Sequence, residues 1–200
     1  MKILQLDKNH PLISEQLTAK GFVVEEDHSS TYDEVLEKII DYQGIIIRSR
    51  IPLDKNFLTK ASHLKFIARV GAGMENIDSK KAQEFGIALI NSPEGNRDAV
   101  AEHVLGMLLL LMNRLFIASS EVKNGIWKRE ENRGDELMEK TFGIIGYGNM
   151  GKATAQRLSG FGVKVIFYDI LPHLSDTFAS QVSLQELQQR ADVISLHIPL

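Results

Sequence analysis

The chain has 200 residues, and its 23 lysines and arginines against 26 aspartates and glutamates give a formal net charge of −3. This weakly acidic balance argues against binding of nucleic acid through its phosphate backbone. The absence of cysteine excludes a disulfide scaffold, an iron–sulfur or thiolate zinc site and a cysteine nucleophile, and it fits a reducing compartment.

Residues 1–90 alternate short apolar runs with amphipathic stretches. The pattern predicts strands over residues 2–6, 22–24, 44–47, 66–68 and 87–90, separated by helices over 12–20, 32–40, 54–60 and 77–85. Strands that alternate with helices indicate an α/β fold, with a parallel sheet covered by helices on both faces.

A turn-rich break over residues 91–96 separates this region from the rest, and we place a domain boundary between residues 98 and 99. One long apolar helix is predicted from residue 99 to about residue 123, followed by a charged loop over 126–140. A second alternation then predicts strands over 142–145, 163–168 and 192–197 and helices over 150–159 and 184–190.

No signal peptide or membrane-spanning segment is expected. The apolar run at the N-terminus ends at Asp7, and the longest apolar run, from Val104 to Met112, falls far short of the roughly 20 residues that a bilayer span needs. We therefore expect a soluble cytoplasmic protein without a membrane partner.

A G-x-G-x-x-G pattern lies between the predicted strand 142–145 and the helix that follows it, with glycines at Gly146, Gly148 and Gly151. In this context the glycines permit a tight turn, close approach of a diphosphate and close packing of helix on strand. The phosphates would meet the free N–H groups where the helix begins, at Asn149 and Met150. The alternative is an ordinary strand–helix turn without a ligand.

Asp169 ends the next predicted strand, eighteen residues after Gly151. At this spacing an acidic side chain accepts hydrogen bonds from the adenosine ribose of a dinucleotide. Its charge would repel a 2′-phosphate, and residues 170–172 supply no compensating cation, so NAD is favoured over NADP. The alternative is a surface aspartate with no ligand.

Only three strands are predicted after the glycine motif, which corresponds to the first half of a dinucleotide-binding domain. The strand before the motif would then be an unpaired edge of its sheet. We therefore expect the chain to be the front portion of a longer protein.

Over its whole length the chain resembles the D-isomer-specific 2-hydroxyacid dehydrogenases. The matching segments are Arg48-Ser49-Arg50, Arg69-Val70-Gly71-Ala72-Gly73, Asn76-Ile77-Asp78, Asn91-Ser92-Pro93 with Asn96, Ala99-Val100-Ala101-Glu102-His103, Gly125-Ile126-Trp127, the glycine motif, Tyr168-Asp169 and Ser195-Leu196-His197-Ile198-Pro199.

The resemblance implies a flavodoxin-like substrate domain over 1–98, completed by a later return of the chain, and a partial Rossmann NAD-binding domain over 99–200. It implies hydride transfer between NAD and C2 of a D-2-hydroxy acid in a cleft between domains. Members that oxidise 3-phosphoglycerate to 3-phosphohydroxypyruvate, in serine biosynthesis, are the most similar. The family's catalytic arginine, glutamate and histidine are expected beyond Leu200, so no catalytic residue is assigned and the chain alone is expected to be inactive. The alternatives are a glyoxylate or hydroxypyruvate reductase and a non-catalytic NAD-binding scaffold.

Six residues are candidates for binding the small anionic 2-hydroxy or 2-oxo acid. Arg48 and Arg50 flank Ser49 just after a buried strand, where an arginine fork suits phosphate or carboxylate. Backbone N–H groups at Ala72 and Gly73 could form an anion-binding concavity. The resemblance supports this role and adds Asn96. The alternatives are solvated arginines and a simple glycine turn.

The resemblance also places Ile198 and Pro199 at the cofactor site. It makes residues 99–140 part of an arm through which a homodimer or larger oligomer would form, with Trp127 as a possible anchor. The six histidines are scattered without ligand spacing, so no metal site is expected.

Overall fold

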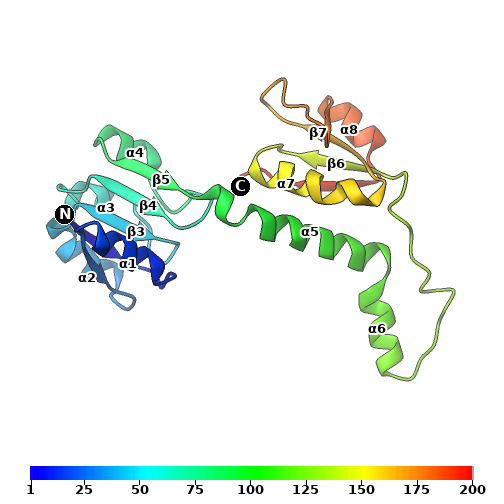
Figure 1. Ribbon diagram of the computed structural model, residues 1–200, viewed down its shortest axis with the longest axis horizontal. Coiled ribbons are helices and arrows are strands. Elements are labelled where there is room, and N and C mark those ends of the chain that lie inside the picture. The colour runs from blue at the N-terminus through cyan, green and yellow to red at the C-terminus, as the bar shows by residue number, and fades with distance from the viewer. Residues whose placement is uncertain (200) are drawn as a thin grey trace. The chain divides into compact units, whose positions relative to one another are not determined.

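The computed structural model describes residues 1–199, and the chain divides into two compact units, Met1–Gly95 and Asn96–Leu200 (Figure 1). Each unit contains one parallel sheet flanked by helices, which confirms the predicted α/β class. The boundary predicted between residues 98 and 99 falls in the first turn of α5 (Arg97–Met112), the helix that opens the second unit.

The first unit is built on a five-stranded sheet in the order β2-β1-β3-β4-β5. This is the flavodoxin-like order, as predicted. The strands are β1 (Lys2–Gln5), β2 (Val23–Glu26), β3 (Gly44–Ile47), β4 (Phe66–Arg69) and β5 (Ala88–Asn91).

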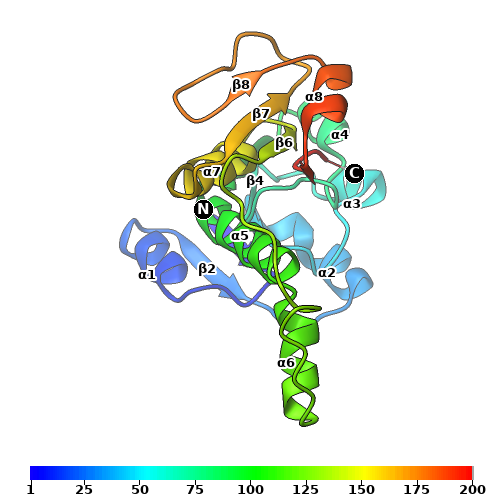
Figure 2. The same ribbon diagram turned by 90° about the vertical axis from the view of Figure 1, so that its right-hand side faces the viewer.

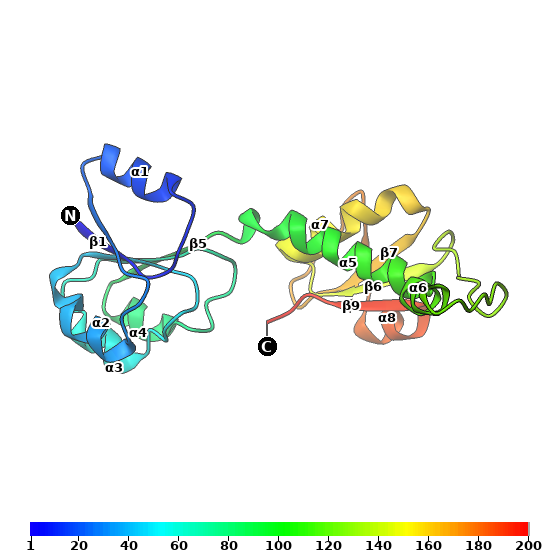
Figure 3. The same ribbon diagram turned by 90° about the horizontal axis from the view of Figure 1, so that it is seen from below.

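Helices cover both faces of this sheet. Helix α1 (Leu12–Ala19) lies on one face, and α2 (Tyr32–Lys38), α3 (Lys55–Lys60) and α4 (Ser79–Glu84) lie on the other (Figure 3). The core forms against the three-helix face, where Ile45, Ile47 and Ile67 are buried. Because both faces of β3 are covered, its four residues are all buried and its sequence is continuously apolar.

The second unit contains a four-stranded sheet in the order β8-β7-β6-β9. Its strands are β6 (Thr141–Ile145), β7 (Lys164–Tyr168), β8 (Ser180–Gln181) and β9 (Val193–Leu196). Numbered within the unit this is the order 3-2-1-4, with which the Rossmann sheet begins. Strand β8 was not predicted, because two residues without an apolar pattern give no strand signal.

The prediction that β6 is an unpaired edge of its sheet is wrong. Strand β9 pairs with β6 on the side opposite β7, with Phe142 in register with Val193. Helix α8 (Leu184–Arg190) carries the chain across the sheet from β8 to β9. Strand β9, and not β6, is therefore the edge strand on this side of the sheet.

Helices α5 and α7 (Asn149–Leu158) pack on one face of the second sheet and α8 on the other (Figure 3). The single helix predicted from residue 99 to about 123 is instead two, α5 and α6 (Leu115–Lys123), whose axes differ by 61°. The break occurs because Arg114 adopts a left-handed conformation, with φ of 50°, after Asn113 has capped α5 by donating from Nδ2 to the Leu109 carbonyl at 3.1 Å.

Helix α6 and the loop that follows it extend away from the sheet of the second unit (Figure 2). Residues 124–140 contain neither helix nor strand, as predicted. Among the described helices none is alone long and apolar enough to cross a membrane; the bent pair α5 and α6 meets that test only when taken together.

Candidate functional site

The glycine motif forms the turn between β6 and α7, and two of its glycines are required by close backbone contacts. Gly146 has a φ of +92°, and a β-carbon there would lie 2.5 Å from the His197 carbonyl oxygen. At Gly151 it would lie 2.3 Å from the Gly146 carbonyl oxygen. The third glycine differs, because among residues 1–199 no atom lies within 4 Å of the place for a β-carbon at Gly148. A ligand can therefore approach the backbone there.

The start of α7 provides an anion-binding position. The helix begins at Asn149, and the residue before it, Gly148, has no side chain that could cap it. The first hydrogen bond back along the helix comes from Lys152, whose N–H donates to the Gly148 carbonyl at 3.0 Å. The N–H groups of Asn149, Met150 and Gly151 therefore lack helical acceptors, and with the helix dipole they favour a phosphate.

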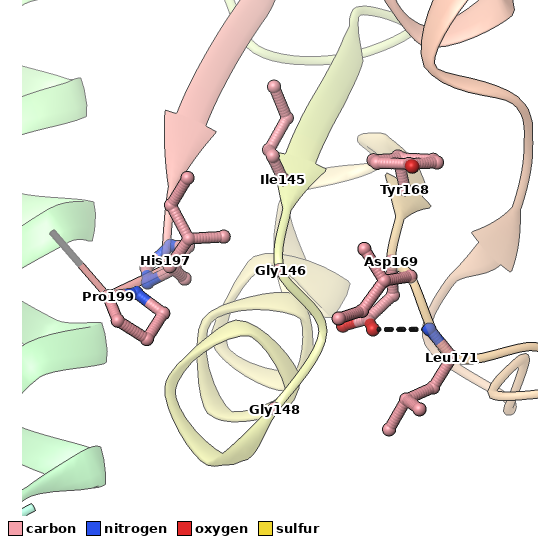
Figure 4. Close-up of a pocket in the computed structure, with 10 residues that line it drawn as sticks. Ile145, Gly146, Gly148, Tyr168, Asp169, Leu171, His197 and Pro199 are labelled. Atoms are coloured by element: carbon pink, nitrogen blue, oxygen red, sulfur yellow. Dashed lines mark hydrogen bonds between the residues drawn. The ribbon is translucent and has the colours of Figure 1, made fainter.

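Asp169 lies where the sequence predicts the ribose-binding carboxylate, at the end of β7 beside the glycine turn. Its Oδ2 accepts from the N–H of Tyr147 at 2.7 Å, and its Oδ1 accepts from the N–H of Leu171 at 2.9 Å (Figure 4). The two backbone donors fix the orientation of the carboxylate. Each oxygen retains acceptor capacity for a hydroxyl.

These groups border one cavity of about 500 Å³ at the carboxyl ends of β6, β7 and β9. Asp169 and Leu171 lie on one side of the glycine turn, and His197 and Pro199 lie on the other (Figure 4). The residues that line the cavity are Ile145, Gly146, Gly148, Tyr168, Asp169, Ile170, Leu171, His197, Ile198 and Pro199.

The lining suits a dinucleotide with an unphosphorylated ribose. It is largely apolar and contains one carboxylate, and no lysine or arginine is among its ten residues. Burial lowers the pKa of the His197 imidazole, whose Nε2 lies 3.0 Å from the Ser195 hydroxyl, so this ring is neutral at pH 7. A 2′-phosphate would therefore meet Asp169 without a compensating cation.

Five of the predicted cofactor residues, Gly146, Gly148, Asp169, Ile198 and Pro199, line this cavity, and Asn149, Met150 and Gly151 form the helix start beside it. The other five lining residues were not predicted from the sequence: Ile145, Tyr168, Ile170, Leu171 and His197. Their position at strand ends is the signal that could have identified them, because ligands bind at the carboxyl edge of such sheets.

Four of the predicted substrate residues lie together at the carboxyl edge of the first sheet. Arg48 and Ser49 are exposed just after β3, and the N–H of Arg48 donates to Asp7 Oδ2 at 2.6 Å. Ala72 and Gly73 follow the neighbouring strand, β4. Asn96 belongs to the second unit, where it is the residue before α5.

The loop that contains Ala72 and Gly73 is held by its carbonyl groups. Asn91 Nδ2 donates to the Ala72 carbonyl at 2.7 Å, and the N–H of Ser92 donates to the Gly71 carbonyl at 2.9 Å. Within the described part of the chain, the N–H groups of Ala72 and Gly73 donate no hydrogen bond. Both remain available to a carboxylate, although the flexible side chain of Glu75 lies against Gly73.

Arg50 is engaged elsewhere in the first unit. Its Nε donates to the Leu6 carbonyl at 2.6 Å, its Nη2 donates to the Asp27 carbonyl at 3.0 Å, and its Nη1 donates to the Ser30 carbonyl. These bonds tie together the loops that follow β1 and β2. The structure therefore gives Arg50 a structural role, and its contact with substrate stays a prediction.

Arg69, the last residue of β4, is a cation that belongs to one of the matching segments but was not predicted as a site residue. Its guanidinium lies over Gly71, where a β-carbon would be 1.6 Å from Nη1. Its Nε is buried and makes no hydrogen bond to any residue that the structure describes. The signal that could have identified it is its position at a strand end next to a glycine loop.

Residues 105–200 match the model of the family "D-isomer specific 2-hydroxyacid dehydrogenase, NAD binding domain". The whole chain is 34% identical to D-3-phosphoglycerate dehydrogenase of Sus scrofa, and it covers 38% of that protein. Over 84% of its length it is 36% identical to hydroxypyruvate reductase of Thermotoga maritima, of which the match covers 55%. The chain thus spans about a third to a half of these curated relatives.

A solved structure agrees with these matches. The NAD-dependent formate dehydrogenase of Staphylococcus aureus in complex with NAD superposes with a TM-score of 0.83 at 26% identity, over all of this chain and 65% of that one. The glycine turn, the position of Asp169 and these similarities agree, and the chain belongs to the D-isomer-specific 2-hydroxyacid dehydrogenase family, with residues 105–200 in its NAD-binding domain.

Proposed function

We propose that this chain is part of a cytoplasmic, NAD-dependent oxidoreductase that transfers a hydride between the cofactor and C2 of a D-2-hydroxy acid. The observation that carries the proposal is the glycine turn with the Asp169 carboxylate fixed beside it by the N–H groups of Tyr147 and Leu171. Bound NAD would supply the hydride acceptor. The start of α7 would hold its diphosphate, and Asp169 would hold its adenosine ribose.

The substrate that we propose is 3-phosphoglycerate, oxidised to 3-phosphohydroxypyruvate in a step that leads toward serine. Arg48 supports it, because this exposed residue follows β3, and the free amides of Ala72 and Gly73 follow β4, the strand that pairs with β3. An arginine at this place suits a phosphate, and backbone amides suit a carboxylate. Since Arg50 is engaged by carbonyl groups, Arg69 takes its place as the second cation at this edge.

A reductase of hydroxypyruvate or glyoxylate is the second candidate. The engagement of Arg50 favours it, because an unphosphorylated 2-oxo acid needs only one anion-binding position. The similarity to the Thermotoga maritima hydroxypyruvate reductase also supports it. A non-catalytic NAD-binding scaffold is the third candidate function.

NADH absorbance, measured with the full-length protein that contains this chain, distinguishes the candidates. The panel contains 3-phosphoglycerate and D-glycerate in the oxidative direction and hydroxypyruvate and glyoxylate in the reductive one. We expect the highest kcat/KM with 3-phosphoglycerate. A preference for the unphosphorylated acids would support the reductase, and NAD binding without turnover of any acid would support the scaffold.

We also propose that a second copy of the chain packs against the arm formed by α5, α6 and residues 124–140. Leu111, Phe116 and Trp127 are 72%, 73% and 79% exposed there, which is unusual for large apolar side chains. The arm has its own internal order, since Glu121 accepts from Lys128 Nζ at 3.0 Å and from Asn132 Nδ2 at 2.5 Å. Sedimentation of F116D should show a monomer where the parent chain sediments as a dimer; an unchanged mass would overturn this proposal.

A further inference from the structure

Tyr147 is the variable residue between the first two glycines of the motif, yet its side chain is fully buried. It does not line the cavity that Gly146 and Gly148 border. Its ring stacks on Phe167 of β7, with centroids 3.8 Å apart and planes 10° apart. The motif therefore places one large aromatic side chain in the core, on the residue between the two glycines that border the cavity.

The phenol of Tyr147 reaches the connection between β7 and β8. Its hydroxyl donates to the Asp176 carboxylate, with distances of 3.0 Å to Oδ1 and 3.1 Å to Oδ2. Asp176 Oδ1 also accepts from the N–H groups of Phe178 at 2.8 Å and Ala179 at 3.2 Å. Burial, and then the hydrogen bond to Asp176, raise the pKa of the Tyr147 phenol, so it stays protonated and donates at any physiological pH.

The backbone of the same residue holds the ribose-binding carboxylate, because the N–H of Tyr147 donates to Asp169 Oδ2 at 2.7 Å. The connection that Tyr147 anchors begins with Asp169 itself, and Ile170 and Leu171 follow; all three line the cavity, and Leu171 supplies the second N–H to Asp169. Both donors to Asp169 thus belong to segments that the Tyr147–Asp176 hydrogen bond joins.

From this arrangement we infer that Tyr147 and Asp176 are positioning residues for NAD: their hydrogen bond holds the glycine turn and the β7–β8 connection at the separation at which Asp169 can bind the adenosine ribose. The inference rests on the proposed NAD site. It assigns cofactor affinity to two side chains outside the cavity lining, one of which is seven residues beyond Asp169 in the chain.

The test is the dissociation constant of NAD and of ADP-ribose, measured by calorimetry with Y147F, D176A and the double variant of this chain. Y147F keeps the stacked ring and removes only the hydroxyl. We expect each single variant to raise both dissociation constants about tenfold, and the double variant to raise them no further, because both changes break one hydrogen bond. In the full-length protein the KM for NAD should rise by the same factor while kcat is unchanged.

The matched control is Y32F. Tyr32 also donates to an aspartate, Asp54 Oδ1 at 2.8 Å, and that aspartate also accepts from a backbone N–H, that of Phe57, as the N-cap of α3. This pair lies in the first unit, so Y32F should leave NAD affinity unchanged. A folded Y147F with unchanged affinity would overturn the inference, and a fall in its melting temperature alone would show a purely structural role.

If Y147F does not fold, D176A carries the test, because alanine offers no acceptor to the Tyr147 hydroxyl, and an unchanged affinity in that variant overturns the inference equally. Loss of NAD binding in the parent chain would instead contradict the proposed function. The two failures are therefore distinguishable.

Discussion

The two sheets of this chain present glycine-containing loops at the same edge, the carboxyl end of their strands, but the groups around the loops have opposite charge. Beside Gly146 and Gly148, Asp169 is the only charged side chain among the residues 1–199 that line the cavity. Beside Gly71 and Gly73 lie the guanidinium groups of Arg69 and, after the adjacent strand, Arg48.

The difference shows two ways to bind an anion at a parallel sheet. In the second unit a helix of ten residues begins at the loop, so free amides and the helix dipole can hold a diphosphate. A carboxylate that binds hydroxyl groups can therefore lie nearby without preventing phosphate binding. In the first unit no helix begins directly at Gly73, since α4 starts at Ser79. There the helix dipole is missing from the loop, and arginine side chains would add to the attraction that the free amides of Ala72 and Gly73 provide.

The sharpest comparison lies within the glycine motif, and it carries the largest expected effect. G148A should leave the fold intact, because the place of its β-carbon is free of described atoms, but the methyl group would occupy the approach of the diphosphate. We expect the dissociation constant of NAD to rise about a hundredfold, equivalent to about 2.7 kcal/mol.

G151A, in contrast to G148A, should destabilise the fold. Alanine usually stabilises a helix relative to glycine by about 1 kcal/mol, but here its β-carbon would meet the Gly146 carbonyl at 2.3 Å. The clash should lower the free energy of unfolding by about 2 kcal/mol, measured by urea titration. If G151A were more stable than the parent chain, the packing role of this glycine would be wrong.

Removing the charge at Asp169 should weaken the discrimination of the second sheet's cofactor site against a 2′-phosphate. D169A should raise the dissociation constant of NAD about thirtyfold, because a charged acceptor for the ribose is lost, at about 2 kcal/mol. The dissociation constant of NADP should rise much less or fall, since repulsion of the 2′-phosphate disappears. Calorimetry with both cofactors measures the ratio, and an unchanged ratio would remove Asp169 from specificity.

How far sequence reasoning reached differs between these features. The glycine turn and Asp169 were predicted correctly in place, because close backbone packing requires glycine at fixed positions and the strand length fixes the spacing to the acid. The five strands of the first sheet were likewise predicted from apolar runs, most clearly β3, whose four residues are all buried because both of its faces are covered.

Features that depend on contacts between distant segments were not predicted. Nothing local distinguishes Arg48 from Arg50, and only the fold brings the carbonyl groups of Leu6, Asp27 and Ser30 around one of them. The break between α5 and α6 was not predicted for a different, local reason: the left-handed conformation of Arg114 has no sequence signature. The role of Tyr147 required knowing that Asp176 would return to it.

The roles of Arg48 and Arg50, which follow β3 in the first unit, can be distinguished by mutation. In the full-length protein R48A should raise the KM for a phosphorylated substrate about tenfold, with no change in melting temperature, because its side chain is exposed. R50A should lower the free energy of unfolding of the first unit by about 2 kcal/mol, because three carbonyl groups lose a charged donor. Equal effects of R48A on phosphorylated and unphosphorylated acids would remove the phosphate argument.

The smallest expected effect is a difference in acid sensitivity between the units. Burial alone would raise the pKa of Asp27, but hydrogen bonds from Lys38, Ser30 and Ser29 outweigh it and hold the pKa of this carboxyl below its usual range. An aspartate with a depressed pKa stabilises the fold above its unfolded pKa, and the contribution is lost as the pH falls through the folded pKa.

D27N should therefore lower the free energy of unfolding of residues 1–95 by about 1.5 kcal/mol at pH 7, and the two proteins should converge as the pH falls below about 4. Hydrogen exchange of peptides from each unit, followed against pH, measures this separately for the two edges. D41N, which alters an exposed carboxylate of the same unit, should show no such convergence. A D27N deficit that persisted at low pH would mean that the loops around Arg50 are held by packing and not by the buried charge, and the electrostatic contrast between the two sheet edges would then be confined to the ligands that they bind.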